Sequence, residues 1–219
     1  MDPRDERDIA AVVSLHADML GTGPIALLGK AFMRDFYYRR LVAGNVVQCH
    51  IAHDGETPVG FIAWTTEKEL GAAIQRRYPF SFALAIAKSI ISSPSRLKVL
   101  LSLARFSRVR GPQPTAAASE SRQGELISLA VRPEFTTRKY LSQTKRRHSL
   151  ELLRAAIEGL RDAGIDRFHG YVERKNRAML FVYQGLGCEL LPVEGLPTIR
   201  VEGAVADALA ALPARATTR

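Results

Sequence analysis

The sequence predicts an α/β fold in a single domain of 219 residues. Hydrophobic residues make up 47% of the chain and charged residues 24%, so the chain has enough apolar side chains for a core of its own. The spacing of apolar side chains alternates between helical periods and strand-like runs. After residue 124 the order strand, helix, strand, helix appears, which is typical of a layered α/β protein.

Two helices and a hairpin are expected in the first 66 residues. Helical spacing of apolar residues covers 8–20, and a second helix extends over about 25–41. Two β-like runs, 46–53 and 59–66, follow, and the turn between them contains Asp-Gly at Gly55. Because Asp-Gly between extended apolar runs favours a tight turn, these runs are predicted to form a hairpin.

Residues 70–110 form a helical insertion in this prediction, with two apolar helical stretches broken near 92–95. The charged side chains between residues 74 and 110 are all basic: Arg76, Arg77, Lys88, Arg96, Lys98, Arg105, Arg108 and Arg110. Such a stretch suits a lid over an acceptor pocket, a cradle for an acyl chain, a contact with an anionic membrane surface, or a hairpin that completes the core. The small, polar residues 111–123 predict a flexible linker.

Regular structure returns at Gly124. The expected elements are a strand over 125–131, a helix over 149–163 that stops at Gly164, a strand over 165–172, a helix over 176–186, short strands over 188–192 and 198–202, and a helix over 204–212. A frayed tail is expected over 213–219. Ligands gather at the carboxyl ends of strands, where a helix N-terminus offers N–H groups to phosphate. The loop between Val131 and Ser149 is therefore the predicted site for a phosphorylated cofactor.

Three segments carry a family resemblance: LISLAVRPEF, SLELLRAAIEGLRDAG and NRAMLFVYQGLGCE. They resemble the acyl-CoA-binding core of the GNAT superfamily of N-acetyltransferases, closely over 124–192 and loosely over 1–66. The resemblance implies a mixed, mostly antiparallel central sheet flanked by helices, with 70–110 as an insertion. It also implies acetyl-CoA or another acyl-CoA as cosubstrate.

The resemblance assigns candidate roles to individual residues. Backbone groups of Leu129, Ala130 and Val131 would bind the pantetheine arm, and Asn176 would bind the cofactor near it. Tyr183 would donate a proton to the departing CoA thiolate as general acid. Glu125 on the central strand is the candidate general base, and Glu67 and Glu173 are the alternatives.

The pyrophosphate loop departs from the family pattern, in which glycines let backbone amides close on phosphate. The chain has TTRKYLSQTKRRHS here, with Lys145 and Arg147 in place of the glycines. We expect basic side chains and the start of the next helix to bind the phosphates instead. These candidate ligands are Arg138, Lys139, Lys145, Arg146, Arg147, His148 and Ser149.

The resemblance predicts an acyltransferase that acts on the amine of a small molecule such as an amino sugar. An acidic acyl carrier protein as donor is the alternative, because the rim of the slot is basic. A non-catalytic binding module is the second alternative, and a homodimer stays open. Nucleic acid is disfavoured as a partner, since the basic stretches contain few aromatic side chains.

Two cysteines, Cys49 and Cys188, are expected to be buried free thiols. No histidine or cysteine pair has the spacing of metal ligands, so no metal is predicted. The polar, acidic start of the chain is unlike a secretory signal, and no apolar run approaches the roughly 18 residues of a membrane span. These features together predict a cytoplasmic protein.

Overall fold

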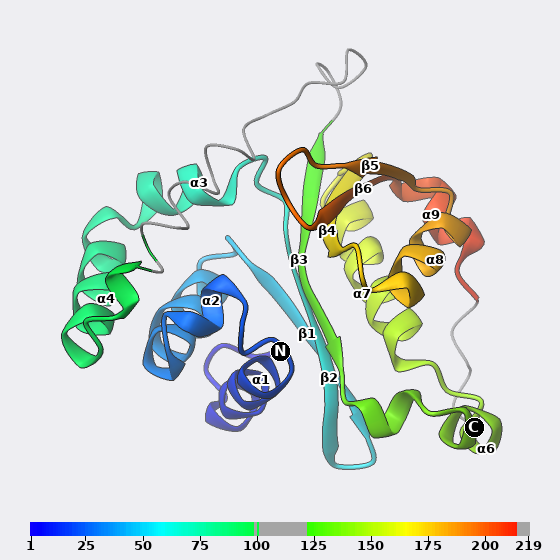
Figure 1. Ribbon diagram of the computed structural model, residues 1–219, viewed down its shortest axis with the longest axis horizontal. Helices are drawn as coiled ribbons and strands as arrows, with labels where there is room; N and C mark the ends of the chain where they lie inside the picture. The colour runs from blue at the N-terminus through cyan, green and yellow to red at the C-terminus, as the bar shows by residue number, and fades with distance from the viewer. Residues whose placement is uncertain (99, 101–121, 214–219) are drawn as a thin grey trace. The chain divides into compact units, whose positions relative to one another are not determined.

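The protein is described by a computed structural model covering residues 1–98, 100 and 122–213. Contacts divide the chain into two compact units, one from residues 1–47 and 69–120 and the other from 48–68 and 121–219. The described part of the first unit is helical, and the second unit contains a six-stranded sheet flanked by helices (Figure 1). The predicted α/β class is confirmed.

The first unit is built on helix packing. Its elements are α1 (Glu6–Met19), α2 (Pro24–Leu27), η1 (Phe32–Leu41), α3 (Leu70–Arg77) and α4 (Pro79–Ser92). The side chain of Asp5 accepts a hydrogen bond from the N–H of Arg7 and caps α1. The Phe82 ring of α4 lies 5.6 Å from the Phe36 ring of η1, so an aromatic contact joins the insertion to the first helices.

The continuous helix predicted over 25–41 is wrong. Gly29 has a φ of 97°, a left-handed conformation that ends α2, and a π-helix follows over Phe32–Leu41. The guanidinium of Arg96 lies so close to Gly29 that a Cβ atom there would come within 2.5 Å of it. Glycine is therefore favoured at this break by its backbone conformation, while the flexible Arg96 side chain can move aside for a larger residue.

The sheet of the second unit has the order β1-β2-β3-β4-β6-β5. Its strands are β1 (Gln48–Asp54), β2 (Thr57–Thr65), β3 (Gln123–Val131), β4 (Arg167–Glu173), β5 (Glu189–Pro192) and β6 (Thr198–Ala204). Neighbouring strands are antiparallel except for β3 and β4, which are parallel. The expected mixed, mostly antiparallel sheet is confirmed.

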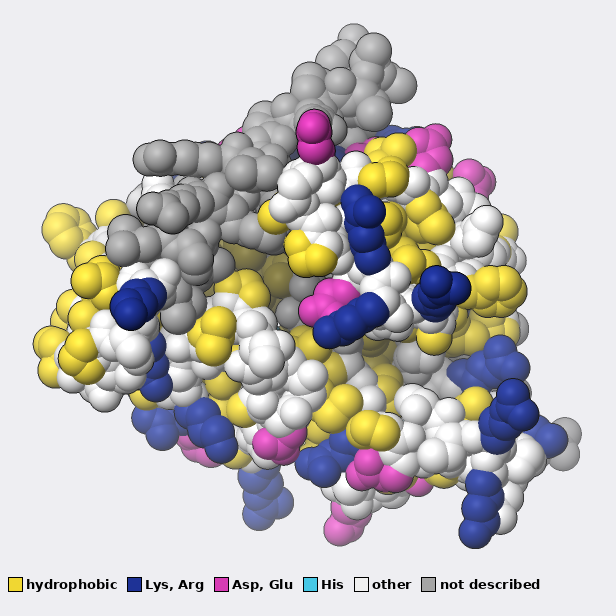
Figure 2. Space-filling model, viewed as in Figure 1, with side chains coloured by type: hydrophobic (Ala, Val, Ile, Leu, Met, Phe, Trp, Pro, Cys, Tyr) yellow, Lys and Arg dark blue, Asp and Glu magenta, His cyan; other side chains and the backbone are white. Residues whose placement is uncertain are grey.

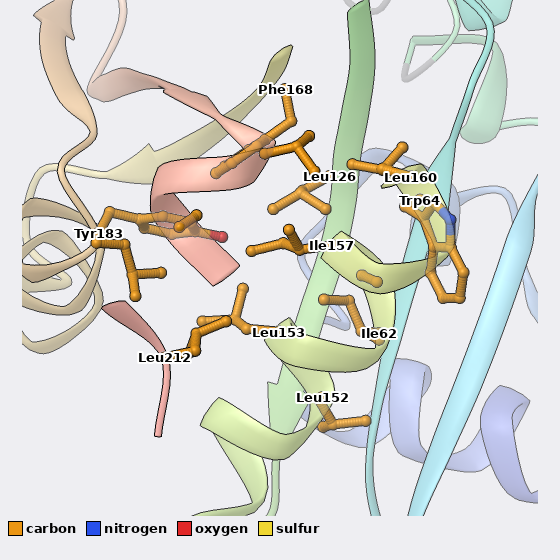
Figure 3. Packing of buried hydrophobic residues seen from close by; sticks show 14 of the residues in the cluster. Ile62, Trp64, Leu126, Leu152, Leu153, Ile157, Leu160, Phe168, Tyr183 and Leu212 are labelled. Carbon is orange, nitrogen blue, oxygen red and sulfur yellow. The ribbon is translucent and has the colours of Figure 1, made fainter. Parts of the chain in front are cut away.

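Helix α7 (His148–Asp162) covers one face of this sheet and forms the core with it (Figure 3). Leu152, Leu153 and Leu160 of α7 are fully buried. A Cβ atom on Gly159 would come within 2.7 Å of the Trp64 indole, so glycine lets the helix approach β2 closely. Burial of large side chains stabilises such a layer by about 1.5–3 kcal/mol each.

The remaining elements of the second unit are mostly those expected. They are η2 (Pro133–Thr136), α6 (Arg138–Thr144), α8 (Arg177–Gly185) and α9 (Val205–Ala211). The sequence did not predict η2 and α6, which lie in the expected phosphate loop. The predicted linker over 111–123 falls outside the described residues except for its end, where β3 begins at Gln123. The second helix of the insertion lies mostly outside them, as does the tail from 214 onward.

Both cysteines are buried free thiols, as predicted. Burial raises the pKa of the Cys188 thiol to about 11, so the thiolate is disfavoured at neutral pH. No helix within residues 1–98, 100 and 122–213 combines the length and apolar character needed to cross a membrane.

His16 makes the stability of the protein depend on pH. Its ring is buried, its Nδ1 lies 2.5 Å from the Tyr38 hydroxyl, and burial lowers its pKa from 6.5 to about 4. The unfolded chain therefore takes up a proton at a higher pH than the folded chain does. The contribution of His16 to stability is complete above pH 6.5 and is lost as the pH falls toward 4, on the order of 3 kcal/mol in all.

We expect His16→Gln to flatten this pH dependence, because glutamine can face the Tyr38 hydroxyl but does not titrate. Urea unfolding of both proteins at pH 7 and pH 4.5, followed by circular dichroism, measures the difference. Equal losses of stability in the wild type and the variant would contradict the assignment.

Candidate functional site at the opening between two parallel strands

The parallel strands β3 and β4 pair over only part of their length. Their register runs from Gln123 opposite Arg167 to Leu126 opposite Gly170. Beyond that point β3 continues to Val131 along β2, while β4 continues to Glu173 along β6. The sheet therefore opens in its middle, between the carboxyl-terminal halves of β3 and β4.

Backbone groups of β3 face this opening. The N–H of Arg132 donates to the carbonyl oxygen of Val59 on β2. In an antiparallel pair the backbone groups of successive residues point alternately toward and away from the partner strand. The groups of Ala130 therefore face β2, and those of Leu129 and Val131 face the opening. Two of the three predicted backbone ligands thus line the opening. Ala130 does not, because its groups belong to the ladder with β2.

A polar row crosses the sheet face opposite α7. Glu125 is in register with Thr65 on β2 and with His169 on β4, and His169 is in register with Glu202 on β6, so these side chains share one face. His169 is 8% exposed and Glu202 only 4%. Burial of a carboxylate requires a partner, and the Nε atom of Arg200 lies 2.5 Å from Glu202 Oε1.

Arg200 also lies beside Tyr171, with 3.5 Å between Nη1 and the hydroxyl oxygen. The sequence interpretation missed Arg200, Glu202 and Tyr171. One signal was available: Arg200 and Glu202 stand two residues apart in the strand TIRVEGA, which places them on the same face.

The two alternative bases lie in different settings. The N–H of Glu67 donates to Thr65 Oγ1, just after the end of β2. Glu173 ends β4 and forms an exposed ion pair with Lys175 at 2.9 Å. Glu125 lies in the part of β3 that pairs with β4, beside His169, whereas Glu173 lies at the open end of β4.

Tyr183 of α8 belongs to the buried cluster beneath the sheet. It is 4% exposed, and its ring points toward Ile157 and Leu126 (Figure 3). Burial raises the pKa of its hydroxyl above the usual range, and the nearby Cys188 contributes to the same shift. Tyr183 is therefore protonated at neutral pH, and its hydroxyl carries a proton that it can donate. Asn176 begins α8, where its Oδ1 accepts from the N–H of Met179.

The loop after β3 contains a short helix that replaces the expected open turn. Thr137 caps α6 by accepting from the N–H of Tyr140, and Lys145 ends the helix with a φ of 59°. Lys145 thus adopts the left-handed conformation that glycine favours, at a position where the family pattern has glycine. The loop keeps a glycine-like backbone without a glycine.

The side chains of two predicted phosphate ligands, Arg146 and His148, contact other parts of the second unit. Arg146 contacts Asp54 Oδ1 at 3.0 Å, Glu151 Oε2 at 3.3 Å and the His53 carbonyl oxygen at 3.2 Å. The buried His148 ring lies 2.8 Å from the Tyr140 hydroxyl through Nε2, and burial lowers its pKa. These contacts tie the loop to the β1–β2 hairpin and to α7.

The start of α7 remains suited to an anion. The helix has 15 residues and no side-chain hydrogen bond at its N-cap, Arg147, so its first N–H groups have no cap. Arg138, Lys139, Lys145 and Arg147 are exposed around it, and Ser149 is half-buried. Within the described part of the chain, no group of His, Cys, Asp or Glu side chains could hold a metal ion.

Comparison with known proteins identifies the fold through solved structures. No family model matches the sequence, and no curated protein matches it. Solved structures do match. SsHAT is 15% identical with a TM-score of 0.57, over 93% of this chain and 96% of that one. A Desulfovibrio desulfuricans protein assigned to the GNAT family of acetyltransferases is 13% identical with a TM-score of 0.52, over 92% and 94%.

A third match is FeeM, an N-acyl amino acid synthase from uncultured soil microbes, which is 13% identical with a TM-score of 0.52, over 93% of this chain and 88% of that one. The chain has the GNAT fold. This confirms the fold class expected from the three sequence segments. In this GNAT fold, the segment LISLAVRPEF supplies β3 from Leu126 onward, including the part at the opening, and the segment NRAMLFVYQGLGCE supplies α8 with Tyr183.

The left-handed Lys145 allows a direct test of the loop geometry. A left-handed conformation costs a non-glycine residue roughly 1–2 kcal/mol. We expect Lys145→Gly to stabilise the protein by about 0.5–1 kcal/mol, since glycine also adds freedom to the unfolded chain. Lys145→Ala is the matched control, because it removes the same charge and keeps the cost. Chemical denaturation compares the three proteins, and equal effects of both substitutions would contradict the assigned backbone conformation.

Proposed function

We propose that the protein transfers an acetyl or longer acyl group from acyl-CoA to the amine of a small molecule. The opening between β3 and β4 carries this proposal. A pantetheine arm is an extended chain with amide groups, so it can pair with the outward groups of Leu129 and Val131 as an added strand would. The likeness in fold to FeeM, an N-acyl amino acid synthase, supports an amine as acceptor.

The start of α7 binds the CoA pyrophosphate in this proposal. N–H groups of His148 and Ser149 and the positive end of the helix dipole attract the phosphates. The exposed side chains of Arg138, Lys139, Lys145 and Arg147 add charge-assisted contacts. Arg146 supports the loop rather than the phosphates, because two carboxylates and a carbonyl group already engage its guanidinium.

The chemical step is a direct transfer. The acceptor nitrogen attacks the thioester carbonyl carbon, a C–N bond forms, and the C–S bond breaks with release of the CoA thiolate. Glu125, on the sheet face opposite α7, takes the proton from the amine, and Tyr183, on the α7 side, gives its hydroxyl proton to the thiolate across the opening. Glu125 is favoured as the base because it lies in the polar row beside His169, whereas Glu173 is exposed and forms an ion pair with Lys175 and Glu67 follows the end of β2.

The polar row offers the acceptor its hydrogen-bonding partners. His169 is next to Glu125 in the row, and Arg200 and Tyr171 lie on the same face of the sheet. A hydroxyl-rich amine such as an amino sugar suits these groups, since each hydroxyl can both donate and accept. Asn176 lies at the start of α8 and contacts the cofactor in this arrangement.

An acyl carrier protein is the second candidate donor. The exposed cations around the start of α7 favour it, because a carrier protein is acidic and delivers the same pantetheine arm. A binding module without catalysis is the third hypothesis. Two buried free thiols suit a reducing compartment, and we place the protein in the cytoplasm on that ground.

Substitution of Tyr183 by phenylalanine tests the reaction. We expect the kcat for thiol release from acyl-CoA to fall about a hundredfold or more, with little change in KM, because only the proton donor is lost. A thiol-trapping assay with an amine acceptor measures it, and the melting temperature checks the fold. Tyr78→Phe, in the first unit, serves as the matched control.

The same assay identifies the acyl donor and can also contradict the proposal. Turnover with an acyl carrier protein and none with acyl-CoA assigns the second donor. Full activity in Tyr183→Phe removes the general-acid role. The absence of transfer from either donor class to a panel of amines contradicts an acyltransferase.

A further inference from the structure

Helix α4 of the first unit is held by one side and exposed on the other. On the inner side, the Phe82 ring contacts Phe36, and Ser89 Oγ donates to the Leu28 carbonyl oxygen at 2.6 Å. Arg96 donates to the Ser89 carbonyl oxygen and to Ser92 Oγ, which satisfies the end of the helix. The helix therefore has a fixed orientation within its unit.

The outer side of α4 is apolar. Phe80 is 88% exposed, Leu84 56% and Ile91 81%. Their spacing of four and seven residues places them in one stripe along the helix. Figure 2 shows hydrophobic side chains gathered over α4, at the left edge of the view. Monomeric proteins rarely expose large apolar side chains together, so such a stripe marks a contact surface.

The charge around this stripe has one sign. Between residues 70 and 98 the charged side chains are Arg76, Arg77, Lys88, Arg96 and Lys98, with no Asp or Glu. Lys88 lies one turn after Leu84 and borders the stripe, Lys98 lies six residues after the end of α4, and both are exposed. An apolar helix face bordered by cations is the pattern of a helix that lies in the interface of an anionic membrane.

We propose that α4 docks the protein on an anionic lipid surface. Phe80, Leu84 and Ile91 enter the boundary between headgroups and acyl chains, and Lys88 and Lys98 contact the headgroup phosphates. A second copy of the chain fits this face poorly. A two-fold contact through the stripe would bring Lys88 toward its own copy, and like charges oppose such an interface.

Sedimentation with vesicles tests the proposal on the full-length protein. Vesicles of phosphatidylcholine with phosphatidylserine should bind the protein, and vesicles of phosphatidylcholine alone should bind it weakly. Added salt should weaken the binding, since it screens the lysines. The double substitution Phe80→Ser and Ile91→Ser should reduce binding at least about tenfold.

Phe181→Ser is the matched control. Phe181 is 78% exposed on α8 of the second unit and lies outside the stripe, so its loss should leave vesicle binding unchanged. Circular dichroism of each variant checks that it is folded. An equal loss in the control variant, or binding that ignores phosphatidylserine, would overturn the proposal.

A fluorescent label gives a second measurement that does not depend on weakened binding. Both natural cysteines are buried, so Ile91→Cys provides one reactive thiol for an environment-sensitive dye. The emission should shift to the blue when anionic vesicles are added. A blue-shifted emission before any lipid is added would show that the face is already covered.

Two further outcomes of the double substitution would assign the face to another partner. Conversion of a dimer into a monomer would assign it to a second copy of the chain, and a loss of binding to an acidic carrier protein would assign it to that protein.

Discussion

The loss of pairing between β3 and β4 beyond Leu126 and Gly170 is the constraint on which the site depends. Backbone N–H and C=O groups are costly to leave without a partner, so a sheet rarely opens in its middle. This sheet tolerates the opening because each strand keeps its other neighbour, β2 for β3 and β6 for β4. The groups that face the opening are consequently ready to pair with an extended ligand.

Helix α7 is held firmly against the sheet next to the opening. Its buried leucines pack on the sheet, and the close contact of Gly159 with Trp64 fixes the helix against β2. The start of the helix is held by Arg146, which connects the loop to Asp54 of the β1–β2 hairpin. The packed layer of α7 and the sheet therefore contains both the strand groups of the opening and the helix amides at the start of α7.

Local patterns predicted the parts of this arrangement that depend on neighbours in sequence. The strand before Arg132 and the helix with Tyr183 are periodic and were placed within two residues of their ends. The sequence could not show that Ala130 faces β2, because that follows from the register with a distant strand. It could not show the contact of Arg146 with Asp54 either, because these residues lie 92 positions apart in the sequence. Gly29 falls inside the helix predicted over 25–41, and only its positive φ identifies the break.

The backbone amides of β3 give the most direct test of a pantetheine arm in the opening. Nuclear magnetic resonance of the amide signals, recorded with and without CoA, distinguishes the groups that face the opening from those in the ladder. CoA should shift the signals of Leu129 and Val131 and slow their hydrogen exchange, and it should leave the exchange of Ala130 nearly unchanged. Equal effects at all three positions, or none at Leu129 and Val131, would contradict a pantetheine arm in the opening.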